Sequence, residues 1–229
     1  MINVELSLIA IVLPVIIFLL YLILASSNFV VTHKKKFSFL TDFPYETFEK
    51  KRNHLGGFSV FIAFLVSEVL VSASMFVNFY DASPDLIGLL ILSALLTVVM
   101  IFLVIRIHTL SAGREKIHLT RFYLMGLGLV LLSSVNGILF LNLSKGRESE
   151  TAVLVLSIIQ FVLALSVVFI LINPRLKDWA RLEKVVDEDG GTSLKRPKPF
   201  VLAFSEWIII FLLVISWLLS AISNYLIVK

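Results

Sequence analysis

The sequence predicts an all-α fold, a polytopic membrane protein in which a bundle of six transmembrane helices is joined by two short interfacial cytoplasmic helices. Two observations predict this fold. Of the 229 residues, 59% are hydrophobic and 16% are charged, and the mean hydropathy of +0.99 lies far above that of a water-soluble domain. The apolar residues also gather in stretches of about 20 residues, the length with which a helix crosses about 30 Å of lipid tails. A soluble globular enzyme is therefore excluded.

Six stretches qualify as spans, and together they predict a single transmembrane domain over residues 1–229. The predicted spans are about 7–31, 57–79, 86–106, 121–142, 152–173 and 203–226. Only four charged side chains fall inside them, namely Glu68, Arg106, Arg121 and Glu206. Because a charged side chain is costly in lipid, this distribution supports the predicted boundaries.

The basic residues predict how the chain is oriented in the membrane. The connections 32–56, 107–120 and 174–202, with the span ends beside them, carry 17 of the 20 Lys and Arg residues. These are Lys34, Lys35, Lys36, Lys50, Lys51, Arg52, Arg106, Arg114, Lys116, Arg121, Arg175, Lys177, Arg181, Lys184, Lys195, Arg196 and Lys198. Since Lys and Arg accumulate in cytoplasmic loops, we expect these connections in the cytoplasm and both termini outside it. The minimal turns on the outside favour a bacterial plasma membrane.

Two of the cytoplasmic connections contain segments with helical character. Residues 42–49 place Pro44 in a first helical turn, and residues 176–186 space their apolar side chains as an interfacial helix does. We expect contact with the lipid bilayer, and two interpretations of connections 32–56 and 174–202 stay open. They bind a membrane or cytoplasmic protein partner, or they are ordinary connectors. Membrane loops account for the positive charge, so no nucleic acid partner is expected.

Glu68 is the one ionisable side chain near the middle of a predicted span. A charged carboxylate in lipid costs several kcal/mol unless it is protonated, paired or hydrated, so Glu68 is a candidate functional residue. Ser72 lies one turn away, and Asn136 and Gln160 lie near the middle of the fourth and fifth spans. One hypothesis is a proton-titrating or cation-contacting site between spans two, four and five. The other is a neutral Glu68 in an ordinary interhelical hydrogen bond.

The fourth span carries small residues that predict close helix packing rather than chemistry. Gly126, Ser133 and Gly137 fall on nearly one face of this helix. Ser133 and Gly137 form a small-xxx-small pair, the pattern that lets the backbones of two membrane helices approach. We therefore expect another helix to pack against this face.

All four histidines, His33, His54, His108 and His118, fall at predicted cytoplasmic ends of spans. Neutral imidazoles ligate zinc, iron and copper, so a metal site at this boundary is one hypothesis. The favoured interpretation is that they are polar flanking residues, because no two of them have the one-turn spacing of a helical metal motif. The chain also has no cysteine for a thiolate site. No metal and no cofactor are predicted.

The sequence contains no Walker phosphate loop, nucleophile elbow or HExxH motif, which disfavours an enzyme. The main hypothesis is a multi-pass integral membrane protein that acts as a non-catalytic subunit or accessory factor of a membrane complex. The alternative is a small proton-linked carrier or channel that uses the intramembrane Glu68. The sequence alone leaves this choice open.

Overall fold

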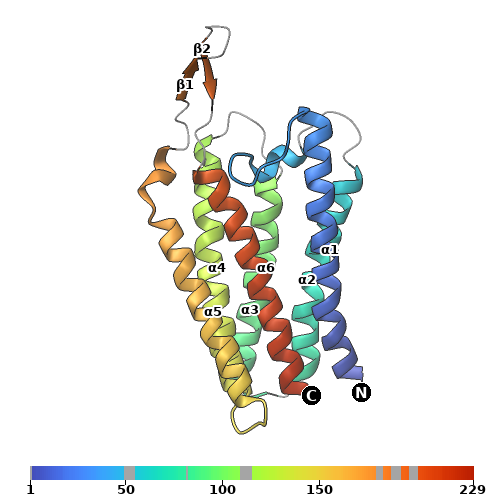
Figure 1. Cartoon of the computed structure of the whole chain (residues 1–229). Helices are drawn as coiled ribbons and strands as arrows, with labels where there is room; N and C mark the ends of the chain where they lie inside the picture. Colours follow the sequence, from blue (N-terminus) through green and yellow to red (C-terminus); the bar gives the residue numbers. More distant parts are fainter. Residues whose placement is uncertain are drawn as a thin grey trace.

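The computed structural model is an all-helical bundle, as predicted, with six helices that are long and apolar enough to cross a membrane (Figure 1). It describes residues 2–48, 55–80, 82–108, 115–178, 183–186, 192–195 and 201–229. The six helices are α1 (Ile2–His33), α2 (Leu55–Phe79), α3 (Pro84–His108), α4 (Glu115–Leu143), α5 (Glu150–Leu171) and α6 (Val201–Val228). Each predicted span coincides with one of them, so the protein is a multi-pass integral membrane protein.

The helices pack mainly as antiparallel neighbours along the chain, α1 with α2, α3 with α4 and α4 with α5. α6 closes the bundle by packing against α1, α2, α4 and α5. It is buried to the same extent as α4, whereas α1, α3 and α5 turn most of their surface outward. Large apolar side chains such as Ile23, Leu95 and Phe169 cover these outward faces. These faces contact lipid, where apolar side chains replace the polar surface of a soluble protein.

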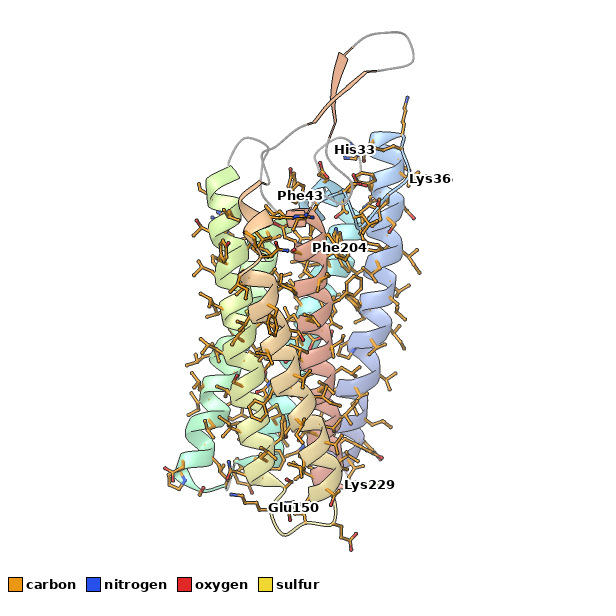
Figure 2. All side chains as sticks on the ribbon, turned by 60° about the vertical axis from the view of Figure 1, so that its left-hand side comes forward. His33, Lys36, Phe43, Glu150, Phe204 and Lys229 are labelled. Carbon is orange, nitrogen blue, oxygen red and sulfur yellow. The ribbon has the colours of Figure 1, made fainter. Side chains whose placement is uncertain are left out.

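The two ends of the bundle differ. Both termini lie at one end, here called the terminal end, and residues 34–48, 174–178, 183–186 and 192–195 lie at the other (Figure 1). In Figure 2, His33, Lys36 and Phe43 mark the second end, whereas Glu150 and Lys229 mark the terminal end. The second end also carries a short antiparallel hairpin, β1 (Glu183–Val186) paired with β2 (Thr192–Lys195), and is called the hairpin end.

Two short 3-10 helices, η1 (Pro44–Phe48) and η2 (Pro174–Asp178), stand where the interfacial helices were predicted. The second one is shorter than expected, because residues 183–186 form strand β1 instead of continuing a helix to Val186. The β-branched Val185 and Val186 favour a strand, and Val186 finds a β-branched partner in Thr192. Helical spacing of apolar residues was therefore misleading in this segment.

Both 3-10 helices are anchored in the bundle core. Phe43, next to η1, is 4% exposed, and Leu176 of η2 is fully buried. The two side chains belong to the larger apolar cluster, which fills the hairpin half of the bundle between the six helices. A second cluster, built around residues such as Met75 and Leu139, fills the terminal half. The core thus runs through the whole length of the bundle.

Candidate functional site

Glu68 faces a small cavity between α1, α2 and α6. The cavity has a volume of about 10 Å³, which is room for one water molecule. Its lining residues are Ala10, Ile11, Pro14 and Val15 from α1, Glu68 and Val71 from α2, and Val214, Trp217 and Leu218 from α6. The structure therefore places Glu68 against the first and last helices, not between spans two, four and five.

Two polar side chains of this cavity have no hydrogen-bond partner among the described residues. They are the carboxyl of Glu68, whose Oε2 is buried, and the indole of Trp217, whose Nε1 is buried. The two side chains are 1% and 2% exposed. A buried polar group that lacks a partner costs about 1–3 kcal/mol.

Pro14 adds a third polar group to the same wall. Proline has no backbone N–H, so the carbonyl of Ala10, four residues earlier in α1, lacks the donor that a regular helix provides. Both Ala10 and Pro14 line the cavity. In a membrane such a carbonyl needs another donor nearby. Three residues of the lining, Glu68, Trp217 and Ala10, thus carry polar groups without a partner in a regular hydrogen-bond pattern, whereas the wall of the cavity itself is mainly apolar.

Glu68 is the only ionisable residue in the lining. On the helices packed around it, Glu5 is exposed in the first turn of α1, Tyr21 hydrogen bonds to His108, and Glu206 lies two to three turns away along α6. No described basic side chain lines the cavity. The carboxyl of Glu68 is therefore stable here when it carries a proton or contacts a small cation, because an isolated carboxylate costs several kcal/mol in an apolar site.

The partners predicted for Glu68 are occupied elsewhere. Ser93 Oγ of α3 donates a 2.5 Å hydrogen bond to Asn136 Oδ1 of α4, and Asn136 Nδ2 donates to Ser220 Oγ of α6 over 2.8 Å. All three side chains are buried. Ser72 is half-buried and makes no hydrogen bond with Glu68. The amide of Asn136 thus joins three helices to each other rather than to Glu68.

Gln160 of α5 belongs to the same network. Its Nε2 donates to Ser216 O over 2.9 Å and to Ser220 Oγ over 3.1 Å, and its Oε1 accepts from Ser216 Oγ over 2.9 Å. Ser133 Oγ lies 3.0 Å from Ser216 Oγ. The Asn136 network, which comprises Ser93, Ser133, Asn136, Gln160, Ser216 and Ser220, therefore cross-links α3, α4, α5 and α6. Its amide groups have little capacity left for a ligand.

A second polar cluster, not anticipated from the sequence, lies at the terminal end of the three helices that enclose Glu68. The Asn78 cluster comprises Ser7 of α1, Ser74 and Asn78 of α2, and Asn224 of α6. Asn78 Nδ2 donates to Asn224 Oδ1 over 2.8 Å, and Asn224 Nδ2 donates to Ser74 Oγ over 2.9 Å. The only sequence signal was two asparagines near predicted span ends, which does not reveal that they meet.

The small residues of α4 lie where helices approach closely. A side chain added at Gly126 would meet Leu171 Cδ2 of α5 at 2.6 Å, and one at Gly137 would meet Phe161 Cζ of α5 at 2.9 Å. Ser133, on the neighbouring part of the helix surface, contacts Ser216 of α6. The sequence did not single out Gly128, where a side chain would meet Met100 Sδ of α3 at 2.6 Å.

The histidines do not meet in one place in the described part of the chain. His33 Nε2 donates to the carbonyl of Glu46 over 3.3 Å at the hairpin end. His108 is buried, with Nδ1 donating to Val104 O over 2.8 Å and Nε2 lying 2.6 Å from Tyr21 Oη. His54 and the side chain of His118 lie outside the described residues. No three His, Cys, Asp or Glu side chains of the described residues are placed to hold a metal ion.

The combination of an unpaired carboxyl, an unpaired indole and a proline-interrupted helix is the most distinctive chemical feature of the described bundle. No family model, curated protein or solved structure matches this chain. The chemistry of the Glu68 cavity and of the two polar clusters is therefore the basis for any functional inference.

Proposed function

We propose that this membrane protein is a small proton-linked carrier or channel in which Glu68 takes up and releases the proton. The observation that supports the proposal is that Glu68 Oε2 and Trp217 Nε1 are both buried without a partner and belong to residues that line one water-sized cavity. An intramembrane carboxyl with no structural hydrogen bond is available for exchange. Asn136 and Gln160, whose amides are used in cross-links, are not.

The groups around the cavity suit a carboxyl that alternates between two protonation states. Protonated Glu68 is neutral and compatible with the apolar side chains that surround it. When Glu68 is ionised, a water molecule in the cavity that its side chain lines is the donor that we expect for the carboxylate. Pro14 breaks the hydrogen-bond ladder of α1 beside the site, and such a break is a common point of helix bending.

A proton flux assay tests this proposal directly. The purified full chain is reconstituted in liposomes that contain a pH-sensitive dye, and a pH gradient is imposed with the membrane potential clamped. We expect a protein-dependent dye response that Glu68→Gln abolishes, because glutamine keeps the size of the side chain but exchanges no proton. Glu5→Gln is the matched control, since Glu5 is an exposed glutamate on α1. Equal flux in the wild type and Glu68→Gln contradicts the proposal.

A non-catalytic subunit or accessory factor of a membrane complex is the second candidate function. It is favoured by the Asn136 network, which uses the interior polar side chains of four helices for structural cross-links. In this function the connections 32–56 and 174–202 would contact the membrane or cytoplasmic partner. Affinity purification in a mild detergent distinguishes the two candidates, because a subunit should bring down a stoichiometric partner and a carrier should be recovered alone.

The proposed orientation places the hairpin end in the cytoplasm and both termini outside it, in a bacterial plasma membrane. The support is electrostatic, since connections 32–56, 107–120 and 174–202 with their flanks carry 17 of the 20 basic residues. A membrane-impermeant label applied to intact cells should modify single cysteines introduced at Asn3 and Lys229 and spare one introduced at Lys36. The opposite labelling pattern would reverse the proposed orientation.

A further inference from the structure

The Glu68 cavity lies between two different parts of the α1, α2 and α6 interface. Toward the terminal end, the same three helices contribute the Asn78 cluster of Ser7, Ser74, Asn78 and Asn224. Toward the hairpin end, they contribute aromatic rings. Beyond the residues that touch Glu68, the interface is therefore polar toward the terminal end and aromatic toward the hairpin end.

The Asn78 cluster retains unused hydrogen-bonding capacity. Asn78 Oδ1 is buried and has no partner among the described residues, although Asn78 Nδ2 donates to Ser7 Oγ over 3.1 Å and to Asn224 Oδ1 over 2.8 Å. Asn78 itself is half-buried and lies one residue from the end of α2. The bundle thus holds an unused hydrogen-bond acceptor near its terminal end.

The step from this cluster to Glu68 is short. Asn224 lies seven residues beyond Trp217 on α6, and Ser7 lies seven residues before Pro14 on α1. Seven residues are two helical turns on nearly the same face, a rise of about 10 Å, or the length of a chain of about three water molecules. The interval is filled by buried apolar side chains of the second core cluster, including Ala10, Val71, Met75 and Ala221, which are smaller than aromatic rings and of which Met75 is flexible.

On the opposite side, aromatic rings fill the interface from Trp217 to the hairpin end. Trp217 packs on Phe64 with ring centroids 6.1 Å apart, Phe64 on Phe18 at 5.1 Å, and Phe18 on Phe211 at 5.7 Å. Phe39, in the connection after α1, continues the column with its ring 5.7 Å from that of Phe211. This aromatic column offers water neither room nor hydrogen bonds.

The connection after α1 closes the hairpin end of the column. Trp207 Nε1 donates a 2.8 Å hydrogen bond to Asp42 O, and the ring of Trp207 packs on that of Phe39 at 5.0 Å. The carboxylate of Asp42 accepts from Ser38 N over 2.8 Å and from Lys35 Nζ over 2.9 Å. The segment that covers the column is thus held by backbone, side-chain and ring contacts.

From this asymmetry we propose that water and hydronium ions reach Glu68 from the terminal end, through the Asn78 cluster, and that in this conformation the aromatic column with the connection after α1 closes the route from the hairpin end. The inference rests on one part of the proposed function, namely that Glu68 exchanges a proton. It does not require net transport across the membrane, because access from one side is enough. The route ends at Glu68, the only ionisable residue of the cavity lining.

Side-specific titration of Glu68 tests the inference without a transport readout. The full chain with a C-terminal affinity tag is reconstituted, and vesicles that display the tag are captured and treated with dicyclohexylcarbodiimide, which reacts with protonated carboxyl groups. Modification of Glu68 is measured by mass spectrometry while the pH of each compartment is varied from about 6 to about 9. Alkaline pH at the terminal end should reduce modification by about tenfold per pH unit above the midpoint. Alkaline pH at the hairpin end alone should leave it unchanged.

Any other dependence overturns the inference, whether modification follows the hairpin-end pH, both compartments equally, or neither. Asn78→Leu should slow the response to terminal-end pH by about tenfold, the effect of one lost hydrogen bond on a rate. Asn142→Leu is the matched control, because Asn142 is a half-buried asparagine at the same end of the bundle that takes no part in the Asn78 cluster. An unchanged response in Asn78→Leu excludes the Asn78 cluster as the route. If Asn78→Leu does not fold, Ser7→Ala provides the same test with a smaller change.

The experiment separates this inference from the proposed function. Modification that follows the terminal-end pH in vesicles without proton flux supports one-sided access and contradicts the carrier or channel. Proton flux that is lost in Glu68→Gln, together with modification that follows the hairpin-end pH, supports the carrier or channel and contradicts the access route.

Discussion

Trp207 Nε1 donates a 2.8 Å hydrogen bond to the backbone carbonyl of Asp42, a residue that precedes it by 165 positions in the chain. Both residues are buried, with exposed fractions of 1% and 2%. The bond ties the connection after α1 to the first turns of α6. It therefore joins the first and last parts of the bundle at the hairpin end, where the aromatic rings of Phe37 and Phe39 also pack on Trp207.

We predict that Trp207→Phe loosens this closure while the bundle still folds. Phenylalanine keeps ring packing on Phe39 but leaves the carbonyl of Asp42 without its donor, so the free energy of unfolding should fall by about 1–3 kcal/mol. Denaturation in mixed micelles measures the change. Trp207→Tyr and Phe204→Tyr are comparison variants. If the free energy of unfolding falls no more in Trp207→Phe than in Phe204→Tyr, the result contradicts a stabilising hydrogen bond to Asp42.

The Asn136 network makes a second prediction. Asn136→Leu removes the hydrogen bonds to Ser93 and Ser220, and it leaves the buried hydroxyl of Ser93 without this partner, whereas Ser220 Oγ keeps Gln160 Nε2 and Ser216 O. Hydrogen bonds between membrane helices contribute about 0.6 kcal/mol on average, so a two-bond loss in a shared network should cost about 1–2 kcal/mol. Asn142→Leu, which removes hydrogen bonds at the surface of the bundle, should cost less than about 0.5 kcal/mol. Equal losses would show that the network contributes nothing to stability.

Close packing of α4 on α5 predicts a third outcome. In Gly126→Ala the new methyl group meets Leu171 Cδ2 at 2.6 Å, so the Leu171 side chain must shift, and we expect a destabilisation of about 1 kcal/mol relative to Gly88→Ala. Gly88→Ala is the matched control, because nothing lies within 4 Å of the added atom. The double variant Gly126→Ala with Leu171→Ala should recover part of the loss. Absence of any difference between Gly126→Ala and Gly88→Ala would contradict the packing.

The composition of the chain was sufficient to predict the six helices but not their neighbours. Lipid requires about 20 apolar residues in succession for a span, and this requirement can be read locally, as at Gly57–Phe79 in α2. The position of Glu68 in mid-span followed from the same reading. The neighbours of Glu68 could not be predicted in this way, because six helices that are apolar on all sides do not reveal from their sequences which helix packs against which. Glu68 was assigned to Asn136 and Gln160, whereas it faces Pro14 and Trp217.

The connection after η2 shows a different limit of sequence reasoning. Leu176, Val185 and Val186 have a spacing that fits an interfacial helix, yet Val185 and Val186 lie in strand β1. The strand exists because it pairs with β2, which begins at Thr192. Strand pairing depends on a partner segment elsewhere in the chain. The spacing of apolar residues within one segment contains no information about that partner, so it favoured a helix where a strand forms.

Pro14 supports the last prediction, which concerns the wall of the Glu68 cavity. Pro14→Ala restores a backbone N–H that can donate to the carbonyl of Ala10, and it removes the ring that lines the cavity. We expect the free energy of unfolding to rise or stay unchanged while Glu68-dependent proton flux falls, because the freed carbonyl is lost to the site. Pro84→Ala is the control, since Pro84 is the first residue of α3 and interrupts no interior helical bond.

The two measurements on Pro14→Ala must diverge for the prediction to hold. A variant that is more stable and equally active would show that Pro14 affects only the backbone of α1. A variant that loses both stability and flux would indicate that the proline ring is needed to fill the space beside Trp217. Only a stable protein with reduced proton flux supports the prediction. In that case Pro14 affects proton exchange at Glu68 through the carbonyl that it leaves without a donor, and not through the stability of the fold.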